Sequence, residues 1–259
     1  MNESSINLPR APAFNLGGRR ALVTGAGRGI GAGAAAALAD AGAAVTLLAR
    51  TASEIDEVAA VIRDRGGEAH AIAVDVSDAA AIRALVNDLP PFDILVNNAG
   101  TNRPKPMVDV TPADYSAVMD LNVRATYFVS QAVCARMAQG AIRGSVIHVS
   151  SQMGHVGAAN RTLYCMSKFA VEGLTKAMAV ELAPLGIRVN SLCPTFIETP
   201  MTAGFLADDA FRTQVLSKIK LGRLARVDDL LGGLIYLASD ASGMVTGSSL
   251  LIDGGWTAD

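Results

Sequence analysis

The sequence contains little cysteine and little net charge of either sign. Its 3 cysteines, Cys134, Cys165 and Cys193, lie far apart with no CxxC pair, so the pattern predicts neither a disulfide framework nor a zinc site. The 22 basic and 24 acidic side chains leave a formal net charge of −2, which provides no basic field for nucleic acid or an anionic membrane. We therefore expect no metal, no nucleic-acid partner and a reducing, cytoplasmic location.

Long apolar runs are also absent. The chain has no uninterrupted apolar stretch of about 18 residues, the length that a membrane-spanning helix needs. The polar segment Met1–Pro12 carries no apolar core of the kind found in signal peptides, so we expect no membrane partner. What the chain does have is 51% hydrophobic and 18% charged residues, which indicates a folded body with a large core.

Short apolar runs alternate with helical patterns along the whole chain. Seven runs are predicted to be strands: Arg19–Thr24, Ala43–Ala49, Glu68–Val74, Phe92–Val96, Ser145–Val149, Gly186–Leu192 and Ser248–Ile252. Because strands joined through helices form parallel sheets, we predict an α/β fold: a single-domain doubly wound (Rossmann) parallel seven-stranded sheet with helices on both faces. Residues 1–17 are expected to be an N-terminal tail, residues 18–259 the domain, and residues 195–220 a substrate lid.

The helical patterns fall between these strands. The expected helices are Ala32–Ala41, Ser53–Arg65, Asp78–Leu89, Ala113–Gln139 and Arg161–Pro184. The last two are long, and they carry most of the polar residues that are considered below as candidates for catalysis.

A glycine turn, Gly25 to Gly31, follows the first strand and opens the first helix. Glycines let the backbone turn tightly and approach a ligand, and the helix N-terminus attracts a pyrophosphate. A GxGxxG pattern alone is weak evidence because such turns also serve packing. Its position inside a strand–turn–helix unit predicts a dinucleotide site.

Two arginines lie where the cofactor ribose is expected. An NAD enzyme would normally carry an acidic residue at the end of the second strand, but Ala49 and Arg50 stand there. Arg28 and Arg50 suit a 2′-phosphate, and no carboxylate is expected to repel it. We therefore favour NADP(H) over NAD(H), with the alternative that both arginines are solvated surface residues.

Two further loops follow strands on the same edge of the sheet. Asp75 follows the third strand and is a candidate to hydrogen-bond an adenine amino group, although it could instead cap a helix, for which Ser77 or Asp78 is better placed. The small residues of Asn97–Gly100 would let backbone approach a cofactor, or could form a simple loop.

A tyrosine and a lysine share one face of the Arg161–Pro184 helix. Tyr164 and Lys168 lie one turn apart, and a buried ammonium beside a phenol is expected to lower its pKa and make it an acid/base. Ser151 ends the fifth strand, where its hydroxyl could bind the reacting oxygen or merely form a turn. Asn122 is a candidate to hold a water beside Lys168, or an ordinary polar helix residue.

These residues together resemble the short-chain dehydrogenase/reductase family from about Arg19 to Trp256. The resemblance is carried by TGAGRGIG at Thr24–Gly31, NNAG at Asn97–Gly100, Asn122, Ser151, YCMSK at Tyr164–Lys168 and the Pro194–Thr199 segment. It implies that Tyr164 is the general acid/base, that Lys168 lowers its pKa and binds the nicotinamide ribose, that Ser151 orients substrate and that Asn122 completes a proton relay.

The turn and the resemblance also give a set of cofactor positions. They are Gly25, Arg28, Gly29, Ile30, Gly31, Arg50, Asp75, Val76, Asn98, Ala99, Gly100, Tyr164, Lys168, Pro194, Ile197 and Thr199. One position departs from the family, which usually has Pro-Gly after the sixth strand, whereas this chain has Pro194-Thr195. The loop there is expected to have less backbone freedom.

The substrate is expected to be a small carbonyl or alcohol compound. The segments that set specificity in the family supply Asn102, Arg103, Gln152, Met153, His155, Arg161, Phe196, Met201 and Phe205. Among them, Arg103, Gln152 and His155 are the candidate substrate contacts. Their polar groups favour a sugar acid, sugar or polyol, because an arginine would pair with a carboxylate. The alternatives are a 3-oxoacyl-carrier-protein reductase and a dinucleotide-binding sensor without catalysis.

Assembly is the last expectation. The two long helices resemble those that form subunit contacts in the family, and the C-terminal strand with Asp253–Trp256 commonly forms a second interface. The resemblance therefore implies a homotetramer, unless the apolar faces are covered within one subunit.

Overall fold

The computed structural model of the chain describes residues 10–258, in which seven parallel strands form one sheet. The strands are β1 (Arg20–Thr24), β2 (Ala44–Ala49), β3 (Glu68–Ala73), β4 (Ile94–Asn97), β5 (Ser145–Val149), β6 (Arg188–Pro194) and β7 (Ser249–Ile252). Their order is β3-β2-β1-β4-β5-β6-β7, with every neighbouring pair parallel. The predicted seven-stranded doubly wound fold is confirmed.

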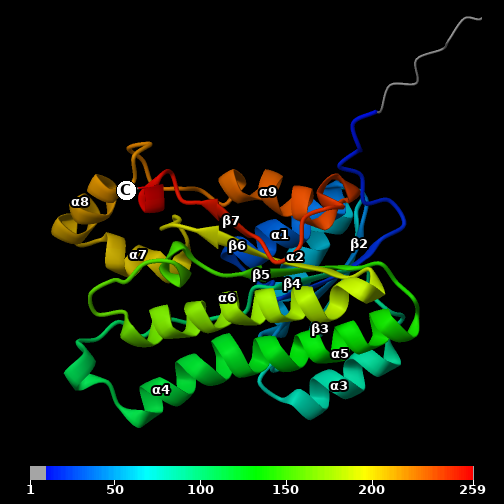
Figure 1. Cartoon of the computed structure of the whole chain (residues 1–259), viewed down its shortest axis with the longest axis horizontal. Helices are drawn as coiled ribbons and strands as arrows, with labels where there is room; N and C mark the ends of the chain where they lie inside the picture. The colour runs from blue at the N-terminus through cyan, green and yellow to red at the C-terminus, as the bar shows by residue number, and fades with distance from the viewer. Residues whose placement is uncertain (1–9, 259) are drawn as a thin grey trace, which may run out of the picture.

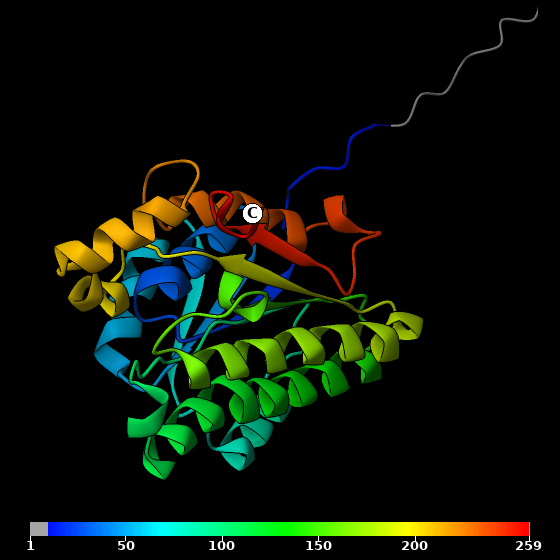
Figure 2. The same ribbon diagram turned by 60° about the vertical axis from the view of Figure 1, so that its left-hand side comes forward.

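Helices cover both faces of this sheet (Figures 1 and 2). One face carries α1 (Gly29–Asp40), α2 (Ala52–Asp64) and α9 (Asp228–Ala238), and the other carries α3 (Ala79–Asp88), α4 (Pro112–Met119), α5 (Thr126–Gln139) and α6 (Thr162–Leu182). The remaining helices, α7 (Pro200–Leu206) and α8 (Asp209–Lys218), lie together at one end of the sheet. Helices on both faces explain why the strands are apolar almost throughout.

The core is divided by the sheet into two halves. In β1, Ala21 and Val23 face the side of α1 and α9, whereas Leu22 between them faces the side of α3 and α5. All three side chains are fully buried, because successive residues of a strand point to opposite faces.

The strand order reverses between β1 and β4, which places the site. Chain connections leave β1 toward one side of the sheet and β4 toward the other, so a crevice forms at the carboxyl ends of these two strands. The α7–α8 pair lies at the same end of the sheet, on the left of Figure 1.

The long helix expected over Ala113–Gln139 is interrupted. A π-helical segment, Asp120–Ala125, separates α4 from α5, and Asn122 lies within it. The Thr126 hydroxyl donates to the Asn122 carbonyl at 2.8 Å, which replaces part of the regular backbone ladder. Such widened turns are frequent at functional sites and leave no clear mark in apolar periodicity.

Part of the expected N-terminal tail belongs to the folded body. Residues 1–9 of the expected tail lie outside the described residues, but Leu16 is buried and its N–H donates to the Ala41 carbonyl at 2.8 Å. The folded body therefore begins before residue 18. Residues 195–220, the segment expected to be a lid, contain α7 and α8, and Leu206, Val215 and Ile219 form a small core of their own there.

Within residues 10–258, no helix is both long enough and apolar enough to cross a membrane.

Candidate active site

The glycine turn is held so tightly that side chains cannot replace its hydrogens. Gly25 has a φ of 63°, and a Cβ there would lie 2.9 Å from the Ala99 Cα. A Cβ at Gly31 would lie 2.1 Å from the Gly25 carbonyl oxygen. The turn therefore folds back on itself at the start of α1 and leaves a bare backbone cradle there, as turns that bind a pyrophosphate do.

The end of β4 braces this turn. The Asn98 side chain donates to the carbonyls of Thr24 at 3.1 Å and Gly25 at 3.0 Å. The Thr24 hydroxyl in turn accepts from the backbone N–H groups of Asn98 at 3.0 Å and Ala99 at 3.1 Å. Asn98 and Ala99, predicted as cofactor contacts, thus form the wall that fixes the cradle.

The region expected to hold the ribose contains a carboxylate that the sequence analysis missed. Arg28 and Arg50 are both exposed at this edge, but Glu54 of α2 lies 3.6 Å from the Arg28 guanidinium. A Cβ at Gly27 would touch the same carboxylate at 2.8 Å. The expectation of no acidic group here is wrong, because α2 turns Glu54 back over the glycine turn.

The other predicted cofactor residues lie around the cradle. Asp75 is exposed and accepts from the Ser77 N–H at 2.9 Å, while Asp78 caps α3, as expected for the better-placed residue. Val76 is buried in the core, and Ile30 packs against the opposite half. A Cβ at Gly100 would lie 3.2 Å from the Asn122 Oδ1, so Gly100 joins the cradle to the π-helical segment.

The loop after β6 returns to the glycine turn. Pro194 ends β6, Ile197 is buried, and its backbone pairs with Ala225. The Thr199 side chain lies 3.6 Å from the position of a Cβ on Gly29. The structure thus brings this loop, distant in sequence, against the start of α1 (Figure 1).

The Tyr164 ring and the Lys168 ammonium are neighbours on α6. The Lys168 Nζ lies 5.5 Å from the centre of the Tyr164 ring and donates to the Val149 carbonyl at 2.9 Å. Ser151, at the carboxyl end of β5, donates to the Gln152 Oε1 at 2.7 Å and accepts from the Met153 N–H at 3.1 Å. The three predicted residues therefore meet at one place, as the sequence spacing indicates.

The titration of this pair differs from expectation. Desolvation raises the pKa of Tyr164 to about 12, although a hydrogen bond with Ser151 and the charge of Arg161 lower it. Burial lowers the pKa of Lys168 to about 8, although Cys193 and Glu172 raise it. The pKa of Tyr164 thus lies above its ordinary value, whereas the sequence analysis expects a lowered one.

Asn122 is buried and links two segments of the site. Its Oδ1 accepts from the Thr101 N–H at 2.8 Å, and its Nδ2 donates to the Thr101 carbonyl at 2.9 Å and to the Ser167 hydroxyl at 3.0 Å. The side chain thus ties the loop after β4 to α6, next to Lys168. Its backbone carbonyl already accepts from Thr126.

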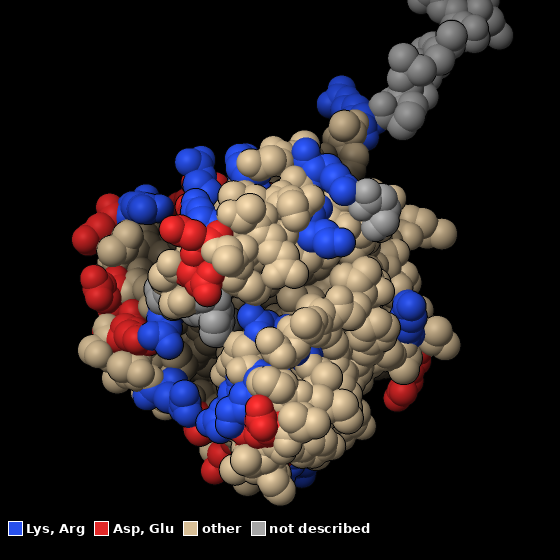
Figure 3. Space-filling view, turned by 90° about the vertical axis from the view of Figure 1, so that its left-hand side faces the viewer, with Lys and Arg blue, Asp and Glu red and all other residues tan. Residues whose placement is uncertain are grey.

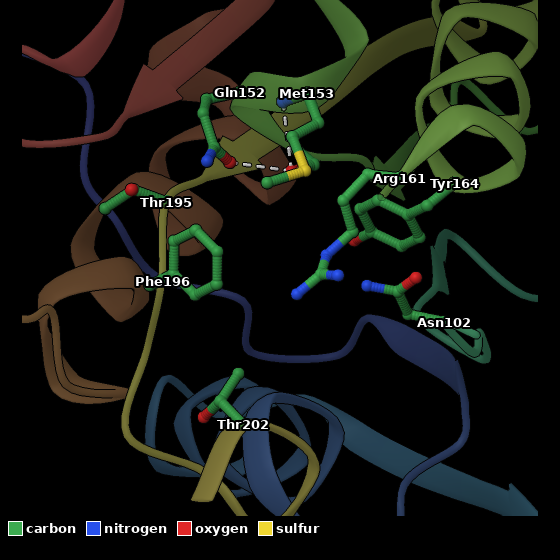
Figure 4. Close-up of a pocket in the computed structure, with 9 residues that line it drawn as sticks. Asn102, Gln152, Met153, Arg161, Tyr164, Thr195, Phe196 and Thr202 are labelled. Atoms are coloured by element: carbon green, nitrogen blue, oxygen red, sulfur yellow. Dashed lines mark hydrogen bonds between the residues drawn. The ribbon is translucent and has the colours of Figure 1, made fainter. Parts of the chain in front are cut away.

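A pocket with a cavity volume of about 70 Å³ opens in front of Tyr164 (Figure 4). It is lined by Asn102, Ser151, Gln152, Met153, Arg161, Tyr164, Thr195, Phe196 and Thr202. Thr195, which stands in place of the family glycine, is buried and lines this pocket, and its hydroxyl has no hydrogen-bond partner among the described residues. The pocket combines polar side chains with apolar surface such as that of Met153 and Phe196, a mixture typical of small-molecule sites.

Two of the predicted substrate contacts, Arg103 and His155, do not line this pocket. Arg103 pairs with Asp114 at 3.2 Å, and Lys105 pairs with the same carboxylate at 2.6 Å. His155 faces Glu172, with its Nε2 3.7 Å from the carboxylate. Gln152, in contrast, does line the pocket. Asp114 holds Arg103, while the His155 Nε2 has no hydrogen-bond partner among the described residues. The side chains of Met201 and Phe205 lie outside the described residues.

Glu172 is a buried residue that the sequence analysis missed. It continues the row of Tyr164 and Lys168 along α6 at four-residue steps, which is the signal that could have found it. Hydroxyls of Ser191 and Ser249 donate to it at 2.9 and 2.5 Å, and hydrogen bonds such as these lower its pKa against the effect of burial. With His155 and Cys193 it forms a polar cluster behind Lys168.

Charged groups surround the mouth of the site. Figure 3 looks at the end of the molecule that carries α7 and α8, where basic and acidic side chains alternate around a hollow. The mixture agrees with the small net charge and gives no single-sign surface at this face.

Several known proteins are similar to this chain over nearly its whole length. A family model described as enoyl-(acyl carrier protein) reductase matches residues 25–257. L-xylulose reductase from Bos taurus is 40% identical over 245 residues, which are 95% of this chain and 99% of that protein. Gluconate 5-dehydrogenase from Gluconobacter oxydans (strain 621H) is 37% identical over 248 residues, 94% of this chain and 96% of that protein.

A solved structure is similarly close. The crystal structure of a gluconate 5-dehydrogenase from Burkholderia cenocepacia J2315, in complex with NADP and tartrate, matches with a TM-score of 0.92 and 37% identity. The match covers 95% of this chain and 98% of that one.

Proposed function

Because this chain belongs to the short-chain dehydrogenase/reductase family and is therefore an NAD(P)-dependent oxidoreductase, we propose that it interconverts a secondary alcohol and a ketone on a sugar acid, sugar or polyol. The observation that carries the proposal is the pocket in which Tyr164 and Ser151 lie together with the polar side chains of Gln152 and Arg161. The names of the relatives, L-xylulose reductase and gluconate 5-dehydrogenase, support the same class of substrate.

In the proposed mechanism, the nicotinamide supplies or accepts a hydride at the substrate carbon when the cofactor is bound. Tyr164 gives the proton to the carbonyl oxygen in reduction and takes it from the alcohol in oxidation. Ser151 donates its hydroxyl proton to the Gln152 Oε1, so in this orientation it accepts from a substrate alcohol, and it donates to a carbonyl oxygen when the hydroxyl turns away from Gln152. The two hydroxyls therefore define where the reacting oxygen lies.

Lys168 and Asn122 support Tyr164 in this proposal. A protonated Lys168 favours the phenolate and holds the cofactor ribose, while Asn122 keeps the loop after β4 against α6 and carries a proton path through water. Glu172 lies behind Lys168 and raises its pKa, so it helps to keep the ammonium charged.

We also propose that NADP(H) is preferred, without exclusion of NAD(H). Arg28 and Arg50 lie at the ribose edge of the cradle, and the related Burkholderia structure contains NADP. Glu54 acts in the opposite direction, since a carboxylate repels a 2′-phosphate and accepts hydrogen bonds from a ribose hydroxyl.

A substrate panel tests the proposal. Purified protein is assayed with both cofactors against sugar acids, polyols, ketoses and 3-oxoacyl thioesters, beside Tyr164→Phe and, as a control, Tyr115→Phe on α4. Loss of the proton donor should lower kcat about 1000-fold in the first variant and leave the second unchanged. Turnover of oxoacyl thioesters alone would show that the protein is an oxoacyl reductase and contradict the proposed sugar substrates. Tight cofactor binding without turnover of any compound would indicate a sensor without catalysis.

A homotetramer is proposed as the assembly. Tyr127 on α5 and Met166, Phe169 and Val180 on α6 are exposed apolar side chains, between 42% and 80% exposed, on two helices that lie side by side (Figure 2). The edge strand β7 carries a further exposed residue, Leu251. Sedimentation equilibrium of the protein and of Phe169→Glu tests this, and a monomeric wild type would contradict it.

A cytoplasmic location is proposed on the state of the cysteines. Cys134, Cys165 and Cys193 are all buried free thiols, which suits a reducing compartment. Recovery of the protein in a secreted fraction of its own cells would contradict this.

A further inference from the structure

The pocket contains a buried arginine that the reaction itself does not use. Arg161 directly precedes α6, one turn before Tyr164, and only 6% of its surface is exposed. Its guanidinium points into the pocket, between Asn102 and Phe196 (Figure 4). A guanidinium brings five N–H donors in a planar fork, and that geometry matches a carboxylate.

The arginine is held in place from two sides. Its Nη1 donates to the Asn160 carbonyl at 3.4 Å, and its Cζ lies 5.7 Å from the centre of the Phe211 ring on α8. Asn160 has a φ of 59°, a conformation that asparagine tolerates better than most residues. This turn, together with the ring from the lid, orients the guanidinium before any ligand arrives.

Two polar atoms of the same pocket have no hydrogen-bond partner among the described residues. They are the Asn102 Oδ1 and the Thr195 hydroxyl, both buried. Such atoms are rare in proteins unless a ligand satisfies them. Figure 4 shows the Asn102 amide with its nitrogen toward the Arg161 guanidinium and its oxygen on the far side. The Thr195 hydroxyl can donate to an anionic oxygen.

We infer that Arg161, together with Thr195, forms a subsite for a carboxylate of the substrate within the pocket that Tyr164 lines. The inference rests on the proposed function and narrows it: the preferred substrate is a polyhydroxy acid, with neutral sugars and polyols as weak substrates. Arg161 pairs with the carboxylate, and Thr195 donates to it.

A second arginine in the same region provides the matched control. Arg103 lies one residue after Asn102, but its guanidinium pairs with Asp114 outside the pocket. Lys105 holds the same carboxylate, so the loop keeps an anchor when Arg103 is changed. Arg161 and Arg103 therefore have the same chemistry, and only one of them faces the pocket.

The test uses pairs of compounds that differ only in carboxylate against hydroxymethyl: D-gluconate with D-glucitol, D-galactonate with galactitol, and D-xylonate with xylitol. Oxidation by wild type, Arg161→Gln, Arg161→Lys and Arg103→Gln is measured as kcat/KM with NADP⁺ and with NAD⁺. We expect wild type to prefer the acid of the active pair, and Arg161→Gln to lower kcat/KM for that acid about 100-fold while the polyol changes little. Arg161→Lys should retain part of the preference and Arg103→Gln all of it.

Two results overturn the subsite. One is a wild type that does not distinguish acid from polyol, and the other is an Arg161→Gln variant that loses both to the same extent. Calorimetric binding of the three acids to the protein with oxidised cofactor separates this inference from the proposed function. Binding that depends on Arg161 without any turnover would keep the subsite and remove the proposed activity, whereas absence of both binding and turnover would remove both.

Discussion

The nucleotide side and the substrate side of this site are built from different materials. The nucleotide side is mostly backbone, where Gly25 and Gly31 leave no room for a side chain and Asn98 fixes their carbonyls. The substrate side is made of side chains, such as Arg161, Gln152 and Thr195, that come from different loops and point into an open pocket. The shape of the nucleotide side depends on glycines that lack side chains. The chemistry of the substrate side depends on which side chains the fold brings together.

The difference explains why the two sides respond differently to substitution. A close-packed backbone turn has no free space, so an added methyl group must displace main-chain atoms. A side chain at the rim of an open pocket can be exchanged while the fold remains, and only its ligand contact is lost. Substitutions on the two sides should therefore separate stability from selectivity.

The largest effect is expected for Gly31→Ala. The new Cβ would stand 2.1 Å from the Gly25 carbonyl oxygen, so the turn must move, and we expect a loss of about 3 kcal/mol in the free energy of unfolding together with loss of cofactor binding. Gly232→Ala on α9, where nothing lies within 4 Å of the added Cβ, should stabilise by about 0.5 kcal/mol. Urea unfolding and cofactor titration measure both, and equal behaviour of the two variants would contradict the rigid cradle.

The next effect concerns Lys168 and pH. Burial lowers its pKa from 10.5 to about 8, so the unfolded chain binds more protons between these values and the penalty for charging Lys168 is present in full below pH 8. Stability should therefore rise with pH between pH 8 and 10.5, by about 3 kcal/mol from this residue. Lys168→Met should remove this rise, whereas Lys176→Met, an exposed lysine on the same helix, should keep it.

Urea unfolding of the three proteins at pH 7.5 and pH 10 gives the measurement. The comparison is made between variants at each pH, so that other titrating groups cancel. A wild type and Lys168→Met with parallel pH curves would mean that Lys168 keeps an ordinary pKa.

The smallest effects are expected at the exposed ribose edge. Arg50→Ala should weaken NADPH binding about 10-fold and NADH binding hardly at all, because only the 2′-phosphate needs the guanidinium. Glu54→Gln should strengthen NADPH binding about 3-fold, since it removes a negative charge beside Arg28. Fluorescence titrations with both cofactors measure the ratio, and an equal loss of both cofactors in Arg50→Ala would remove Arg50 from the 2′-phosphate site.

Local sequence patterns were sufficient to predict much of the fold. Apolar runs separated by helical segments predicted all seven strands to within a few residues, and the glycine turn and the Tyr164–Lys168 spacing marked both ends of the site. These signals are local because backbone conformation and helix faces depend on residues close together in the chain. The break at Asn122 was missed, since a π-helical turn hardly changes apolar periodicity.

The sequence by itself thus determined the fold, the family and the reaction class, whose markers are short and contiguous. Tertiary structure alone decided which charges face the ligand. It turned Arg103 toward Asp114 and His155 toward Glu172, placed Glu54 against Arg28, and left Arg161 in the pocket. The physical reason is that a charged side chain on a loop takes its direction from partners that are distant in sequence, and only the folded chain brings those partners together.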